Sequence, residues 1–295
     1  MLTQKQKEEL AARLRSGVQS ASAVSQEEWD SYPATVRELA VSTSQGDARV
    51  YAVSPENARE SKPLILNFHG GGFIVKHMDR DELFCRKMAK RFDALVLDVD
   101  YRLAPENPYP AAVLECWDVA KWAYENCAAL GADPSKIILT GHSSGGNLAA
   151  GICMRAGQTG AFRPLCAVID YAPLDLMTDP ADKKQSICDM PAERAQAYNA
   201  KYIAPEKAED PFVSPVYADP ALLEHFPATL VISAGEDRLC EENELFAMKL
   251  AQAGVVVTSK RFTESIHGFV INRMCEWEQA TELIFTFIAQ RLSGE

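Results

Sequence analysis

The chain has 295 residues, 47% of them hydrophobic and 24% charged, which is the balance of a globular protein and excludes disordered and fibrous classes. Its formal net charge of −11, without a basic cluster, argues against binding to nucleic acid or to an anionic membrane and favours a small-molecule partner. A chain of this length can bury one large α/β core with further segments attached to it.

The first ten residues lack the apolar core of a signal peptide, and no stretch approaches the roughly 18 apolar residues of a membrane span. We therefore expect a cytoplasmic protein. The cysteines are scattered without a Cys-x-x-Cys pair, so their spacing predicts neither a zinc site nor a redox motif.

In chain order, a helical pattern at 6–18 precedes the first predicted strand, near 48–53. Beyond that point short apolar runs alternate with helical patterns. Further strands are predicted at 64–68, 94–99, 137–139, 166–169, 228–232 and 255–258, and helices at about 81–91, 111–127, 241–253 and 276–292. This alternation predicts an α/β fold whose mostly parallel sheet is covered by helices on both faces.

Two segments do not follow the alternation. They are residues 1–45 and a polar segment at about 177–210 that contains three prolines. We predict a core at 46–295 that carries the second segment as an insertion. Both segments can cover a site at the sheet, although insertions over an α/β sheet are also common as surface decoration.

A Gly-x-Ser-x-Gly pentapeptide, Gly141-His142-Ser143-Ser144-Gly145, follows the apolar run 136–140 and precedes a helical stretch. This is the pattern of a nucleophile elbow, in which a serine is exposed on a sharp, strained turn between a strand and a helix. Glycines are needed there because the turn leaves no room for neighbouring Cβ atoms. Ser143 is therefore the candidate nucleophile.

A serine hydroxyl needs a general base, and histidine is the usual choice because its pKa is about 6.5. Among five histidines, His267 lies in the loop after the last predicted strand, at the strand-end rim where α/β active sites assemble. Asp237 follows the strand at 228–232 and completes the chain order Ser, Asp, His. Glu236 is the alternative carboxylate, and the pattern alone does not separate the two.

The segment His69-Gly70-Gly71-Gly72 directly follows the strand at 64–68. Attack on a carbonyl places negative charge on its oxygen, which needs preorganised N–H donors, and glycines let the backbone approach that oxygen closely. The N–H group of Ser144, the residue after the nucleophile, can add a further donor. An oxyanion hole is therefore expected between the glycine segment and the elbow.

Several blocks, in this order, resemble the hormone-sensitive-lipase-like esterases of the α/β-hydrolase superfamily. They are His69-Gly70-Gly71-Gly72-Phe73, Asp100-Tyr101-Arg102-Leu103-Ala104-Pro105-Glu106, the elbow, Asp210-Pro211-Phe212-Val213-Ser214-Pro215, Gly235-Glu236-Asp237 and His267-Gly268-Phe269. The blocks cover most of residues 64–270 and are together highly specific.

The resemblance implies an α/β-hydrolase fold with a catalytic triad of Ser143, Asp237 rather than Glu236, and His267. It also implies an oxyanion hole of the N–H groups of Gly71, Gly72 and Ser144. Residues 1–45 and the insertion at about 177–210 would then form a cap over the acyl pocket. The block from Asp100 to Glu106 is a structural one in this family.

The chain departs from the family pattern at several positions. The family elbow usually reads Gly-Asp-Ser-Ala-Gly-Gly, whereas His142 and Ser144 occupy the variable positions here, and Arg238 replaces a common proline. Lys76 and His77 follow the glycine segment where small or neutral residues are more usual, which predicts a more polar pocket mouth. Four aromatic residues are further candidates for lining the pocket: Trp29, Tyr32, Tyr198 and Tyr202.

These features predict a serine carboxylesterase that cleaves short acyl esters of small soluble substrates through an acyl-enzyme, with no cofactor and no metal. One alternative is an amidase or deacetylase with the same triad. Another is a non-catalytic ligand-binding protein of the same fold, which ranks lower because His267 is present. The sequence leaves the oligomeric state open, a homodimer included.

Overall fold

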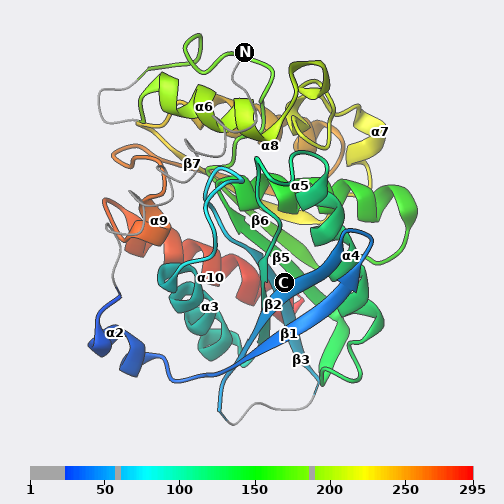
Figure 1. Cartoon of the computed structure of the whole chain (residues 1–295). Coiled ribbons are helices and arrows are strands. Elements are labelled where there is room, and N and C mark those ends of the chain that lie inside the picture. Colours follow the sequence, from blue (N-terminus) through cyan, green and yellow to red (C-terminus); the bar gives the residue numbers. More distant parts are fainter. Residues whose placement is uncertain (1–23, 57–60, 186–189, 295) are drawn as a thin grey trace.

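A single eight-stranded sheet forms the centre of the protein in a computed structural model that describes residues 24–56, 61–185 and 190–294 (Figure 1). The strand order is β1-β2-β4-β3-β5-β6-β7-β8, in which β1 and β2 run antiparallel to their neighbours and the other pairs are parallel. The strands are β1 (Thr35–Thr43), β2 (Gly46–Ser54), β3 (Lys62–Phe68), β4 (Leu95–Asp100), β5 (Ala132–His142), β6 (Cys166–Asp170), β7 (Ala228–Ala234) and β8 (Val257–Phe262).

Helices cover both faces of the sheet, as the sequence predicted. They are α2 (Gln26–Ser31), α3 (Asp79–Phe92), α4 (Ala111–Glu125), α5 (Ser144–Thr159), α6 (Ala192–Tyr202), α7 (Pro220–Leu223), α8 (Cys240–Gln252), α9 (Phe269–Asn272) and α10 (Trp277–Ser293), with short 3₁₀ turns at Pro205–Lys207 and Pro215–Tyr217. Among the described residues, no helix is both long enough and apolar enough to cross a membrane.

The side chains of the central strands point alternately to the two faces of the sheet, and each face has its own hydrophobic core. Leu64 and Leu66 of β3 belong to the core that contains the buried side chains of α4, α5 and α8. Ile65, between them, belongs to the core that contains those of α3, α9 and α10. Successive residues of a strand point to opposite faces, so a strand buried on both faces must be apolar throughout. This requirement explains the uninterrupted apolar runs.

The predicted boundary at residue 45 needs a correction, because β1 lies inside the expected N-terminal segment and is part of the sheet. Edge strands weaken the apolar-run criterion: β1 is largely exposed and was missed, and four of the six residues of β8 are exposed, so that the strand predicted at 255–258 overlaps only the start of β8. Polar residues at such edges limit pairing with other chains. The predicted helix at 6–18 lies outside the described residues.

The insertion at about 177–210 contains α6, which lies above the carboxyl ends of the strands in Figure 1. Its C-terminal Tyr202 is buried and stacks on Phe73, with ring centroids 3.6 Å apart. The described part of the N-terminal segment lies elsewhere, because Arg86 of α3 contacts Trp29 and the carbonyl of Tyr32. Of the two predicted covering segments, α6 therefore lies over the strand ends, whereas α2 packs beside α3.

Candidate active site

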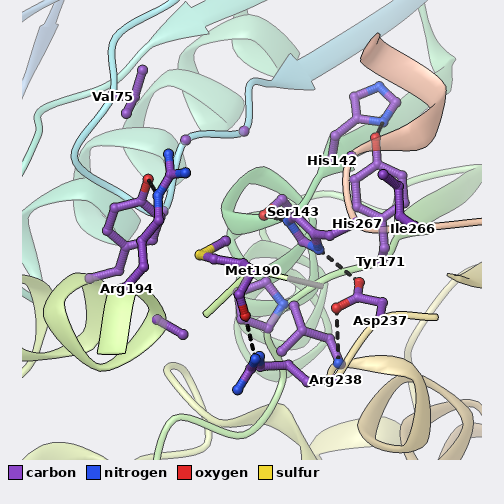
Figure 2. A pocket seen from close by; sticks show the side chains of 18 of the residues that line it. Val75, His142, Ser143, Tyr171, Met190, Arg194, Asp237, Arg238, Ile266 and His267 are labelled. Atoms are coloured by element: carbon purple, nitrogen blue, oxygen red, sulfur yellow. Dashed lines mark hydrogen bonds and ion pairs between the residues drawn. The ribbon is translucent and has the colours of Figure 1, made fainter. Parts of the chain in front are cut away.

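A pocket of about 610 Å³ opens at the carboxyl ends of the parallel strands. It is lined by the glycine segment after β3, the elbow after β5, the loops after β7 and β8, and α6. Figure 2 shows the side chains that line it, with Ser143 near the centre. This is the edge at which open α/β sheets bind ligands.

Ser143 lies between β5 and α5 in a strained backbone conformation, with φ of 53° and ψ of −123°. A non-glycine residue with positive φ is uncommon, and this one matches the strained turn of a nucleophile elbow. A Cβ at Gly145 would lie 1.8 Å from the carbonyl oxygen of Phe68, and one at Gly141 would lie 2.2 Å from the backbone of Gly145. Glycine is therefore required on both sides of the serine.

Three of the predicted residues form one hydrogen-bonded chain. The Oγ atom of Ser143 is 2.9 Å from Nε2 of His267, and Nδ1 of His267 is 2.7 Å from Oδ2 of Asp237 (Figure 2). Asp237 is 2% exposed, and its Oδ1 accepts a hydrogen bond from the N–H of Leu239, which fixes the carboxylate. The alternative carboxylate, Glu236, is absent from the pocket lining.

The glycine segment turns sharply beside the elbow. Gly71 and Gly72 have φ of 133° and 58°, values that favour glycine, and the Gly71 carbonyl accepts hydrogen bonds from the N–H groups of Ile74 and Val75. Within the described residues, the N–H groups of Gly71, Gly72 and Ser144 donate no backbone hydrogen bond. Gly71 and Gly72 line the pocket, whereas Ser144 is buried directly after Ser143 and is not part of the lining.

The Ser144 hydroxyl has a structural partner that the sequence did not indicate. It lies 3.2 Å from the Tyr101 hydroxyl, which in turn donates to the His69 carbonyl at 2.8 Å. Because Tyr101 has one hydroxyl proton, Ser144 is the donor in the first bond. The elbow and the glycine segment are thus joined through Tyr101, which gives the Asp100–Glu106 block its structural role.

His142, the other unusual elbow residue, points away from the nucleophile in a buried network. Its Nδ1 lies 2.7 Å from Oδ2 of Asp170, and burial raises the pKa of that carboxyl. Tyr171 connects this network to the site, since its hydroxyl lies 3.4 Å from Nδ1 of His142 and its ring packs edge-on against His267. The backbone carbonyl of Asp170 also accepts a hydrogen bond from the N–H of Ser143. No sequence motif pointed to Asp170 or Tyr171.

His77 pairs with a buried carboxylate and is not part of the pocket lining. Its Nε2 is 2.7 Å from Oδ2 of Asp98, and Asp98 is completely buried. Burial alone would lower the pKa of His77, but the Asp98 carboxylate, together with Asp81 and Asp100, raises it to about 9. Lys76 is exposed and is not part of the lining. The prediction of a more polar mouth from these two residues was therefore wrong.

Of the four aromatic candidates, only Tyr198 lines the pocket. Its ring covers the glycine segment, because a Cβ at Gly72 would lie 2.5 Å from Cδ2 of Tyr198. Tyr202 is buried in the core, and neither Trp29 nor Tyr32 is part of the lining.

Arg238, which follows Asp237, joins the loop after β7 to the insertion. Its guanidinium donates to the carbonyls of Pro180 and Met190 (Figure 2). These acceptors lie near the two ends of the segment that leads into α6. The residue therefore secures the insertion next to the carboxylate that contacts His267.

A family model described as the alpha/beta hydrolase fold matches residues 65–271. The carboxylesterase NlhH of Mycobacterium tuberculosis is 32% identical over 230 residues, which are 76% of this chain and 72% of that protein. Human hormone-sensitive lipase is 39% identical over 110 residues, 37% of this chain and 10% of the lipase. The crystal structure of EstE1, a thermostable carboxylesterase cloned from a metagenomic library, is similar with a TM-score of 0.84 and 28% identity, covering 97% of each chain.

The eight-stranded sheet, the strained serine and these matches define the class of the protein: the chain belongs to the α/β-hydrolase family. Within that family it is one of the carboxylic ester hydrolases related to hormone-sensitive lipase, as the ordered motifs predicted.

Replacing Gly145 by alanine tests the elbow packing. We expect Gly145→Ala to lower the free energy of unfolding by about 3 kcal/mol or more, at the upper end of overpacking costs, because the new Cβ meets backbone atoms. Urea unfolding measures the change. Gly151→Ala in the same helix is the control: the closest atom to its Cβ would be the end of the Val113 side chain at 3.3 Å, so the change in stability should stay within about 1 kcal/mol. Equal stability of the two variants would contradict the packing argument.

The His77–Asp98 pair predicts a pH-dependent stability. The folded-state pKa of about 9 exceeds the ordinary value of 6.5, so the stabilisation is complete below pH 6.5 and is lost as the pH rises through 9. The loss is at most on the order of 3 kcal/mol. His77→Gln should remove this component from the pH profile of urea unfolding, whereas His225→Gln, at an exposed histidine, should retain it. Identical profiles for wild type and His77→Gln would refute the assignment.

Proposed function

We propose that the protein is a serine carboxylesterase that hydrolyses short acyl esters of small substrates through an acyl-enzyme. The observation that carries the proposal is the hydrogen-bonded chain from Ser143 through His267 to Asp237, beside three unused N–H donors. Its elements match the roles of nucleophile, general base, orienting carboxylate and oxyanion hole. The pocket volume lies within the usual range for small-molecule sites, roughly 300–1,000 Å³.

In the acylation step, Oγ of Ser143 forms a bond with the ester carbonyl carbon while its proton passes to Nε2 of His267. Asp237 holds the histidine tautomer that accepts this proton and stabilises the resulting imidazolium. The carbonyl oxygen becomes an oxyanion bound by the N–H groups of Gly71, Gly72 and Ser144. The bond to the alcohol oxygen then breaks, and the alcohol leaves with the proton from His267.

In the deacylation step, a water molecule attacks the acyl carbon and gives its proton to His267. A second oxyanion forms in the same hole. The bond between that carbon and Oγ breaks, Ser143 recovers its proton from His267, and the carboxylic acid leaves. Every proton transfer uses Nε2 of His267, which already lies within hydrogen-bond distance of Ser143. No metal or cofactor takes part in the proposed cycle.

The central test removes the nucleophile. Ser143→Ala should lower kcat for 4-nitrophenyl acetate by a factor of about 10⁶ and abolish labelling by a fluorophosphonate probe. Urea unfolding should show that the variant remains folded, and Ser135→Ala, at an exposed serine, should keep wild-type turnover. Undiminished hydrolysis by a folded Ser143→Ala variant would overturn the proposal.

The choice between the two neighbouring carboxylates has its own test. Asp237→Asn should reduce kcat by a factor on the order of 10⁴, because an amide stabilises the wrong tautomer of His267. Glu236→Gln is the matched control, and its kcat should stay close to wild type because Glu236 is not part of the pocket lining. Steady-state kinetics on the same ester compare the two. A larger loss for Glu236→Gln would assign the role to Glu236.

A further inference from the structure

The pocket lining is more basic than the chain as a whole. The sequence has 30 basic and 41 acidic residues, whereas the lining has four basic residues and three acidic ones. The basic residues are Arg80, Lys183, Arg194 and Arg238, and the acidic ones are Asp81, Asp175 and Asp237. A surplus of positive charge in the pocket of an acidic protein needs an explanation.

Two of the four cations have structural partners. Lys183 forms an ion pair with the buried carboxylate of Glu242 and also donates to the Asp175 carbonyl. Arg238 is held by the carbonyls of Pro180 and Met190. Both side chains therefore secure the insertion to the core. Any cation available to a ligand must come from Arg80 or Arg194.

Arg194 extends from α6 and stands across the pocket from Ser143, His267 and Asp237 in Figure 2. Its Nε donates to the Tyr198 hydroxyl at 3.1 Å, and its guanidinium lies over the Tyr198 ring. No carboxylate of the described residues forms an ion pair with it, and its two terminal nitrogens make no hydrogen bond there. Tyr198 thus orients the guanidinium, and among the described residues no other group binds its terminal N–H groups, which are therefore the candidate donors to a ligand.

Arg80, on α3, lines a different part of the same pocket. Its Nη1 donates to Oδ1 of Asn272 at 2.5 Å, while its Nε is buried without a partner among the described residues. Both sequence neighbours of Arg80 are acidic: Asp79 is exposed, and the carboxyl of Asp81 is buried and has a raised pKa because of that burial. The carboxyl group of Asp81 also accepts a hydrogen bond from the N–H of Met78, so it does not interact with Arg80 alone. Arg80 therefore keeps positive charge in the pocket.

Guanidinium groups with free N–H donors match the geometry of a carboxylate, which accepts two parallel hydrogen bonds. Their attraction to a carboxylate is stronger in a partly buried pocket than in bulk water. We propose that the preferred substrates are esters that carry a free carboxylate, bound by Arg194 with a contribution from Arg80. This inference rests on the proposed esterase function and specifies its substrate class.

The carboxylate can belong to the acyl group or to the leaving alcohol, and two matched pairs of substrates distinguish these sources. For the acyl side, 4-nitrophenyl hydrogen glutarate is compared with 4-nitrophenyl 5-methylhexanoate, in which an isopropyl group replaces the carboxylate with similar shape. For the alcohol side, 4-acetoxybenzoate is compared with neutral 4-acetoxybenzamide. Initial rates, corrected for uncatalysed hydrolysis, give kcat/KM for each member.

We expect the wild-type protein to prefer the anionic member of at least one pair, and the pair identifies the side that carries the charge. Arg194→Met should reduce this anionic-to-neutral ratio by about 10- to 100-fold, the usual range for a charge-assisted hydrogen bond. Arg194→Lys should retain part of the ratio, because it keeps the charge but not the planar donors. Arg80→Met should reduce the ratio to a smaller extent. Arg163→Met, at an exposed arginine outside the lining, should leave every ratio unchanged.

The outcomes separate this inference from the function on which it rests. Hydrolysis of the neutral esters without an anionic preference in either pair would overturn the substrate class and leave the esterase function standing. So would a preference that survives both Arg194→Met and Arg80→Met. Failure to hydrolyse any of the four esters would overturn the esterase function itself. Added salt supplies a second readout, because it should raise KM for the preferred anionic ester and not for its neutral partner.

Discussion

The close approach of two backbone segments at Gly145 is the constraint on which the site depends. The carbonyl of Phe68, at the end of β3, occupies the space that any Cβ at Gly145 would need, so α5 begins pressed against the neighbouring strand. This contact keeps Ser143 in its strained conformation and sets the elbow next to the glycine segment. Strain of this kind persists only when the surrounding structure enforces it.

Buried polar groups next to the site form three sets of hydrogen bonds and ion pairs. Tyr101 links the Ser144 hydroxyl to the carbonyl of His69, and His142 pairs with Asp170, whose own carbonyl binds the N–H of Ser143. His77 and Asp98 form the third set. Buried polar groups are costly unless they are paired, so the pairs that do form favour one arrangement of the loops next to them, although His142 Nε2 and Asp170 Oδ1 have no hydrogen-bond partner among the described residues. Residues outside the proposed catalytic triad therefore help to shape the pocket.

The sequence predicted the central strands and the residues that meet in the pocket, because both leave local signals. Uninterrupted apolar runs identify strands buried on both faces, and Gly-x-Ser-x-Gly identifies a turn that tolerates no Cβ. Edge strands such as β1 carry polar residues, so that signal was missing and the boundary at residue 45 was misplaced. Asp170, Tyr171 and Arg194 were also missed, because their importance depends on which distant segments the fold brings beside them. The pattern alone did not separate Asp237 from Glu236; the family resemblance favoured Asp237, and Asp237 is the carboxylate that contacts His267 in the structure.

The Arg238 contacts bear on how the covering segment can change during evolution. Its acceptors, at Pro180 and Met190, are backbone carbonyls rather than side chains. Every residue type supplies such a carbonyl, so substitutions in the segment leave the attachment in place as long as the chain follows the same path. At these two points the side chains of the segment can therefore vary without loss of its attachment to the loop that carries Asp237, whereas the ion pair of Lys183 with Glu242 depends on a side chain of the segment. Arg238 thus makes part of the segment's position depend on its backbone path and not on its side-chain sequence.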